Sequence, residues 1–121
     1  VELELPPEVL NDDRIALARL NGSFFFGTAA DVTSVLERIG SRPQILIVDF
    51  GSVTLCDGSA AHAFAAMAIR LHAAGTKILL SGLRTDVAHV LAQEGVSAPI
   101  VTLVSDVKEA LSVAHQHLQQ D

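Results

Sequence analysis

The chain has 121 residues, of which 50% are hydrophobic, and its formal net charge at pH 7 is −6. This length and apolar content suffice for one compact domain, and the acidic balance argues against nucleic acid or an anionic membrane surface as a partner. The single cysteine, Cys56, excludes an internal disulfide, and the longest apolar runs, at 45–48 and 78–80, are far shorter than the ~20 residues that cross a bilayer. We therefore expect one soluble domain over residues 1–121, in a reducing compartment. Its start at Val1 suggests that it is cut from a longer protein.

The first 40 residues predict two strands and a helix. Residues 1–5 and 15–20 have the apolar content of strands, and a turn at 21–22 is expected to close the second. The helix is indicated by apolar residues at positions i, i+3, i+4 and i+7, followed by Gly40 as a left-handed stop. These apolar residues are Val32, Val35, Leu36 and Ile39.

The rest of the chain alternates strands with helices. Strands are expected at 45–48, 77–80 and 100–103, and the first is apolar throughout, which predicts cover on both of its faces. The apolar stripes of three further helices contain Ala61, Phe64, Ala68 and Leu71; Val87, Val90 and Leu91; and Val107, Leu111, Ala114 and Leu118. Such alternation requires mostly parallel pairing, so the predicted fold class is α/β, with a central, mostly parallel sheet of four to five strands and about four helices.

The segment after the 45–48 strand carries the candidate site. Residues 49–56 are expected to form a loop that leads to Asp57 and Ser59 at the start of a helix. Unpaired N–H groups and the helix dipole favour negative charge there, so this is a suitable place to add or remove a phosphate. A structural role for Ser59 as helix N-cap is an equally open interpretation. The candidate regulatory loop comprises Asp57, Gly58, Ser59, Ala60 and His62.

Catalytic chemistry has less support from the sequence. Asp57, Ser59 and His62 are the residue types of a hydrolytic triad, but they lie within six residues and the G-x-S-x-G elbow is missing. The histidines show no metal-ligand spacing and the glycines form no phosphate-binding motif, so we expect neither a metal nor another cofactor. Cys56 is either a thiolate activated by the helix start or a small buried hydrophobe. A small α/β enzyme using Asp57, Ser59 or Cys56 is kept as an alternative class.

Three segments together resemble the STAS domains shared by SulP anion transporters and the bacterial anti-sigma factor antagonists. Residues 21–29, Asn-Gly-Ser-Phe-Phe-Phe-Gly-Thr-Ala, resemble the start of the first helix in the transporter domains. Residues 46–59, a strand that leads to Cys-Asp-Gly-Ser, are similar to the strand and loop common to both branches. Residues 75–83 resemble the next strand of the family. In this order and spacing, the likeness covers nearly the whole chain.

The resemblance implies a non-catalytic domain that regulates by contact. In the antagonists, a partner kinase phosphorylates the serine two residues after the loop aspartate, and Ser59 holds that position here. Ala60 departs from the family pattern, which usually has glycine after the hydroxyl residue. The segment that favours the transporter branch comprises Phe25, Phe26, Gly27 and Thr28.

Two functions follow as expectations from this resemblance. The first is a regulatory domain on the cytoplasmic side of the inner membrane, belonging to a SulP-type transporter of sulfate, bicarbonate or a related anion. Its expected partners are the transmembrane domain of the parent and a cytosolic regulatory protein or kinase, with pairing into a homodimer left open. The alternative is a free-standing anti-sigma factor antagonist that is regulated by phosphorylation of Ser59.

Overall fold

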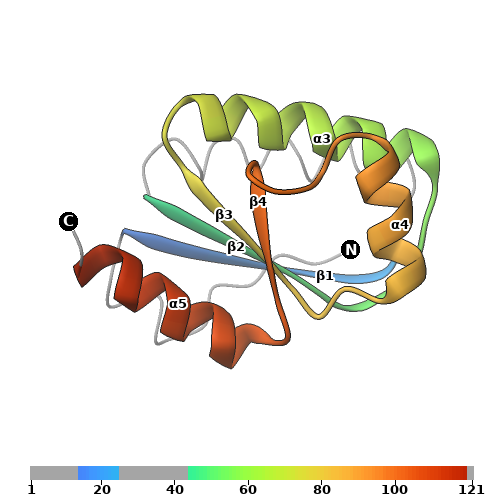
Figure 1. The fold of residues 1–121 in the computed structure, drawn as a ribbon. Coiled ribbons are helices and arrows are strands. Elements are labelled where there is room, and N and C mark those ends of the chain that lie inside the picture. Colours follow the sequence, from blue (N-terminus) through green and yellow to red (C-terminus); the bar gives the residue numbers. More distant parts are fainter. Residues whose placement is uncertain (1–13, 25–43, 120–121) are drawn as a thin grey trace.

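The computed structural model describes residues 14–24 and 44–119 (Figure 1). Its elements are β1 (Ile15–Phe24), β2 (Ile45–Cys56), α3 (Gly58–Ala73), β3 (Lys77–Ser81), α4 (Thr85–Gln93), β4 (Val101–Val104) and α5 (Val107–Gln119). The four strands pair in parallel, in the order β1-β2-β3-β4. For these residues the prediction of an α/β fold with a central parallel sheet is confirmed. The strand expected at 1–5 and the helix expected at 32–39 lie outside the described residues.

Helices cover both faces of the sheet. Figure 1 shows α3 and α4 on one face and α5 on the other. Alternate residues of β2 divide between the two faces: Leu46 and Val48 join the apolar cluster under α3 and α4, while Ile45 and Ile47 join the cluster under α5. All four side chains are fully buried. The prediction that this strand is covered on both faces is therefore confirmed.

Helix α3 lies close to the sheet because the residues it buries are mostly small. Ala60, Ala61 and Ala68 have no exposed surface, and the one aromatic residue of the helix, Phe64, is equally buried. The ring of Phe64 meets that of Phe50 on β2 edge to face, with centroids 5.4 Å apart. This aromatic pair fixes α3, and thus its first turn, on the sheet.

Two strands are longer than predicted. β1 continues through the expected turn at 21–22 to Phe24, and β2 continues through the expected loop at 49–56 to Cys56. These two expectations are wrong because the extensions pair with each other, and register shifts after Arg19 and after Gly22 absorb the turn-forming residues. The extended end of β2 leads directly into α3.

Glycines follow two of the helices. Gly75 follows α3 and Gly95 follows α4, and both have a φ of +97°, in the left-handed region that L side chains rarely adopt. The N–H of each glycine bonds back to its helix, to the carbonyl of His72 and of Ala92 respectively. The chain therefore passes from α3 to β3 within three residues, whereas seven residues separate α4 from β4.

Candidate functional site

Asp57 is the N-cap of α3. Its backbone is extended, and its carboxylate accepts a hydrogen bond from the N–H of Ala60 at 2.8 Å. This bond satisfies one of the unpaired donors of the first turn, and the negative charge lies at the positive end of the helix dipole. The interpretation of Ser59 as the N-cap is therefore wrong, because Asp57 already holds that position.

Ser59 lies in the first turn of α3 and faces solvent. Gly58 and Ser59 are exposed, whereas Ala60 is fully buried in the cluster under α3. The departure from glycine at position 60 thus has a packing role, since the methyl group of Ala60 fills space in the core. The Ser59 side chain is left accessible to another protein.

We expect the cap to contribute to stability and the serine not to. Asp57→Ala should lower the free energy of unfolding by about 1 kcal/mol, because it leaves the Ala60 N–H without its side-chain partner. Asp57→Asn, which keeps an acceptor oxygen, should recover most of this loss. Ser59→Ala should change stability by less than about 0.5 kcal/mol, as is usual at exposed positions. Urea unfolding followed by circular dichroism measures all three, and a larger loss for Ser59→Ala than for Asp57→Ala would contradict the assignment.

His62 contacts Glu94 and is not placed as the catalytic base that the residue types suggested. Its ring is exposed, and Nδ1 lies 2.9 Å from Oε1 of Glu94, the C-cap residue of α4. The contact connects the first part of α3 to the end of α4. Ser59 and His62 therefore do not form the nucleophile and base pair of a triad.

Cys56 is a buried thiol at the end of β2. Burial, and secondarily the charge of Asp57, raises the pKa of Cys56 from 9.0 to about 11. The Sγ atom donates a weak hydrogen bond to the carbonyl oxygen of Asp57 at 3.6 Å. Of the two interpretations, the thiolate activated by the helix start is contradicted, and the small buried hydrophobe is the one that the geometry supports.

A labelling experiment checks the state of this thiol. Because the nucleophile is the thiolate, a raised pKa and burial both slow alkylation. At pH 8 we expect iodoacetamide to label Cys56 in the folded protein more than about tenfold more slowly than in urea-unfolded protein. Mass spectrometry measures the labelling rates. Equal rates in the folded and unfolded states would contradict a buried thiol with a raised pKa.

An exposed apolar residue beside the candidate loop was not predicted from the sequence. Leu55, next to last in β2, is 52% exposed, two residues from Asp57. Its side chain adds exposed apolar surface close in sequence to Asp57 and Ser59. We refer to Leu55, Asp57, Ser59 and His62 together as the contact surface.

A polar row across three strands was also missed by sequence reasoning. Arg19, Asp49 and Ser81 are register partners on β1, β2 and β3. The Asp49 carboxylate accepts hydrogen bonds from Arg19 Nε at 3.2 Å, from the Ser81 hydroxyl at 3.1 Å and from the Gly51 N–H at 2.9 Å. Each of the three row residues follows an apolar strand segment, and this shared position was the available signal. The row connects the middle of β1 and the middle of β2 to the carboxyl end of β3.

Other features bear on the class of site. Phe25, Phe26, Gly27 and Thr28 lie outside the described residues. Across 14–24 and 44–119, no cluster of three His, Cys, Asp or Glu side chains is placed to hold a metal ion. In the same part of the chain, no helix has the length and apolar character needed to cross a membrane.

Comparisons with known proteins bear on the fold and the family of this chain. The family model described as the STAS domain matches residues 6–110. The STAS domain of a SulP transporter from Vibrio cholerae is 28% identical, with a TM-score of 0.70 over 98% of this chain and 89% of that chain. The unphosphorylated anti-sigma factor antagonist SpoIIAA is 14% identical, with a TM-score of 0.71 over 94% of this chain and 96% of that chain.

A complete transporter also contains this fold. The murine anion transporter Slc26a9, in its inward-facing state, is 16% identical with a TM-score of 0.74, and the match covers 96% of this chain and 21% of that chain. The comparison with curated proteins gives no match. From the family model and from its likeness in fold to SulP transporter domains, we conclude that this chain belongs to the STAS domain family.

Proposed function

We propose that this chain is the cytoplasmic regulatory domain of a SulP-type anion transporter and that it acts by binding other proteins through the contact surface. The observation that carries the proposal is the first turn of α3, where Ser59 is exposed on a helix held rigidly by its cap and its buried aromatic residue. The likeness to the V. cholerae SulP domain supports the transporter branch. The transmembrane domain of the parent, or a cytosolic regulator, is the partner in this proposal.

The groups in and next to the contact surface are better suited to binding a protein than to catalysis. Cys56 is a protonated, buried thiol, and His62 is engaged with Glu94 instead of with Ser59. The hollow between α4 and β4 is lined by other residues and includes no member of the contact surface. Ser59 has no base beside it among the described residues, and it lies outside the hollow between α4 and β4. Both observations favour a non-enzymatic role.

Transport by the full-length parent tests the proposal. Ser59→Arg places a bulky cation on the contact surface, and Ser112→Arg makes the same change at an exposed position of α5, on the opposite face of the sheet. We expect Ser59→Arg to reduce the rate of radiolabelled sulfate or bicarbonate uptake severalfold at equal membrane abundance, while Ser112→Arg matches the wild type. Equal uptake by both variants, or a parent gene without membrane helices, would contradict the proposal.

A second candidate function is that of a free-standing anti-sigma factor antagonist. The observation that favours it is the accessible hydroxyl of Ser59 at the positive end of α3, where a phosphate is electrostatically tolerated. Incubation with its partner kinase and ATP should then add one phosphate to the wild type and none to Ser59→Ala. A protein mass that stays constant would count against this alternative.

A further inference from the structure

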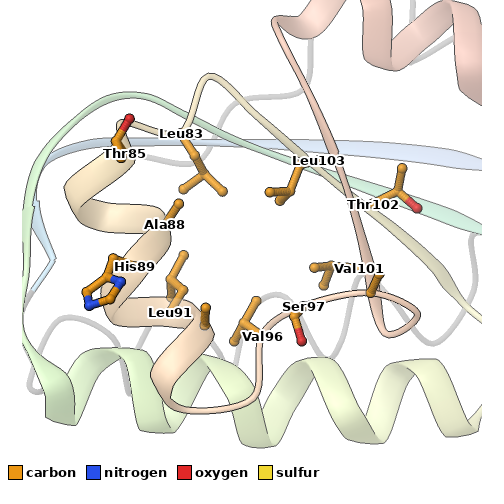
Figure 2. Close-up of a pocket in the computed structure, with 12 residues that line it drawn as sticks. Leu83, Thr85, Ala88, His89, Leu91, Val96, Ser97, Val101, Thr102 and Leu103 are labelled. Atoms are coloured by element: carbon orange, nitrogen blue, oxygen red, sulfur yellow. The ribbon is translucent and has the colours of Figure 1, made fainter.

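A hollow lies between α4 and the edge strand β4, away from the contact surface. Its volume is about 510 Å³, within the usual range for binding pockets. Figure 2 shows the side chains of Leu83, Val101 and Leu103 directed into the space between α4 and β4, whereas the ring of His89 lies on the other side of α4. Leu91 and Val96 complete the apolar wall. A hollow lined in this way selects an apolar group and disfavours an anion or a nucleotide.

The hollow opens beside an edge strand. Within the described sheet, β4 is the last strand and pairs with β3 alone. The Val104 carbonyl accepts a hydrogen bond from the Gly82 N–H at the end of β3. Because the polar backbone groups of successive residues in a strand point to opposite sides, those of Leu103 point away from β3, to the open edge.

The sequence of β4 leaves this edge only partly protected. Strands at sheet edges are usually protected by short length, charged residues, proline or a bulge, and β4 has the short length, four residues, but no charged residue or proline in Val-Thr-Leu-Val. Leu103 is 56% exposed and adds apolar surface to this edge. The open backbone and the apolar hollow therefore lie side by side on one element.

The charges at the two ends of β4 have opposite signs. At its amino end, Lys77 shares a smaller hollow with His72, His117 and Thr102. Just past its carboxyl end lie two exposed acidic residues, Asp106 before α5 and Glu109 in its first turn, with one exposed cation, Lys108, between them. Antiparallel pairing is the more stable arrangement per residue. The amino end of an added antiparallel strand lies beside the acidic end of β4, and its carboxyl end lies beside Lys77. Such a strand complements these charges when it carries a basic residue at its amino end and an acidic residue at its carboxyl end.

We propose that β4 and the adjoining hollow bind an extended peptide segment of a partner protein by strand addition. The segment pairs antiparallel with β4 through its backbone and inserts a branched apolar side chain between Leu83, Leu91 and Leu103. It carries a basic residue before this anchor and an acidic residue after it. Backbone pairing gives affinity in this mode of recognition, and the pocket for alternate side chains gives specificity. This interface is separate from the contact surface of the proposed function.

The experiment uses a defined peptide, acetylated and amidated Lys-Val-Thr-Leu-Thr-Val-Glu, in which Val, Leu and Val share one face. Titration into ¹⁵N-labelled protein should shift the amide signals of Val101 to Val104 and protect the Leu103 N–H from hydrogen exchange. Substituting proline for the central leucine of the peptide removes the anchor and one backbone donor, so binding should be lost. Peptide binding that leaves the β4 amides unchanged would overturn the proposal.

Matched variants of the protein separate pocket filling from general damage. Ala88→Phe fills the hollow and should lower the affinity for the peptide at least tenfold. Ala66→Phe, at a half-buried position of α3 outside the hollow, should leave this affinity unchanged. Leu103→Glu, at an already exposed position, should weaken it similarly and keeps the test valid if Ala88→Phe fails to fold. Lys77→Glu should weaken binding severalfold at low salt. Unchanged affinity in Ala88→Phe and Leu103→Glu would contradict the proposal.

Two other occupants give different results in the same titration. If β4 pairs with a second copy, its amide signals change with protein concentration before any peptide is added, and the peptide does not displace that copy. If the hollow is a site for lipid, sodium decanoate shifts the signals of Ala88 and Val101 while the peptide has no effect. Either result would overturn the peptide proposal. Substitution of Ser59 should leave peptide affinity unchanged, so failure here is distinguishable from failure at the contact surface.

Discussion

Replacing Phe64 by alanine is expected to lower the free energy of unfolding by about 3–5 kcal/mol. The ring of Phe64 is fully buried and packs edge to face on Phe50. Its neighbours on the same face of α3, Ala60, Ala61 and Ala68, are too small to fill the space that the ring leaves. The loss therefore combines the transfer free energy of the ring with the cost of a cavity.

Urea unfolding of Phe64→Ala, followed by circular dichroism, measures this loss. Ile69→Ala is the matched control, because Ile69 lies on the same helix but is 47% exposed. It should cost less than about 1 kcal/mol, since little apolar surface is buried there. Similar losses for the two variants would show that α3 is not fixed on the sheet by its aromatic residue.

Replacing Asp49 by alanine is expected to lower the free energy of unfolding by about 2 kcal/mol. The change deprives three donors of their acceptor: the Arg19 guanidinium, the fully buried Ser81 hydroxyl and the Gly51 N–H. Arg19 and the Gly51 N–H can turn to water, but the Ser81 hydroxyl has no exposed surface from which to do so. The cost of leaving a buried donor unpaired is therefore the main part of the loss.

The control for Asp49→Ala is Asp86→Ala at the start of α4. Asp86 also bonds to an arginine, Arg84, at 3.1 Å, and this bond is the first cause of its lowered pKa. Both side chains of that pair are largely exposed, so solvent screening makes its loss small. Chemical unfolding of both variants should show a clear loss for Asp49→Ala and a much smaller one for Asp86→Ala. The reverse order would contradict the role assigned to the polar row.

The α/β architecture could be predicted because each described element has an unambiguous apolar pattern. The run at 45–48 is apolar at every position, and the structure buries both of its faces. The stripe of Ala61, Phe64, Ala68 and Leu71 predicted the buried face of α3. In these segments, local preference and tertiary packing agree.

The failures come from pairing between segments that are distant in sequence. Nothing local indicates that β1 passes through Asn21 and Gly22, because the partner that extends it is the end of β2, about 30 residues further on. Gly51 and Ser52 interrupt the apolar run in the sequence, so the extension of β2 resembled a loop. The polar row escaped notice for the same reason, since only the register brings Arg19, Asp49 and Ser81 together.

At the candidate site, the sequence predicted the location better than the roles. Asp57 and Ser59 do lie at the start of a helix, but the cap is the aspartate. Asp57 and Ser59 are both residue types that cap helices, and the backbone conformation decides which of them is the N-cap. The exposure of Leu55 could not be predicted, because alternation breaks down in this part of β2.

Photo-crosslinking in the full-length parent tests most directly whether the start of α3 is a surface for binding another protein. A benzophenone amino acid placed at position 59, and in a second variant at Ser112 on α5, reports which exposed residue lies against a partner. The account predicts a crosslink from position 59 to the transmembrane domain or to a cytosolic regulator, and none from position 112. Crosslinking from position 112 with none from position 59 would contradict it.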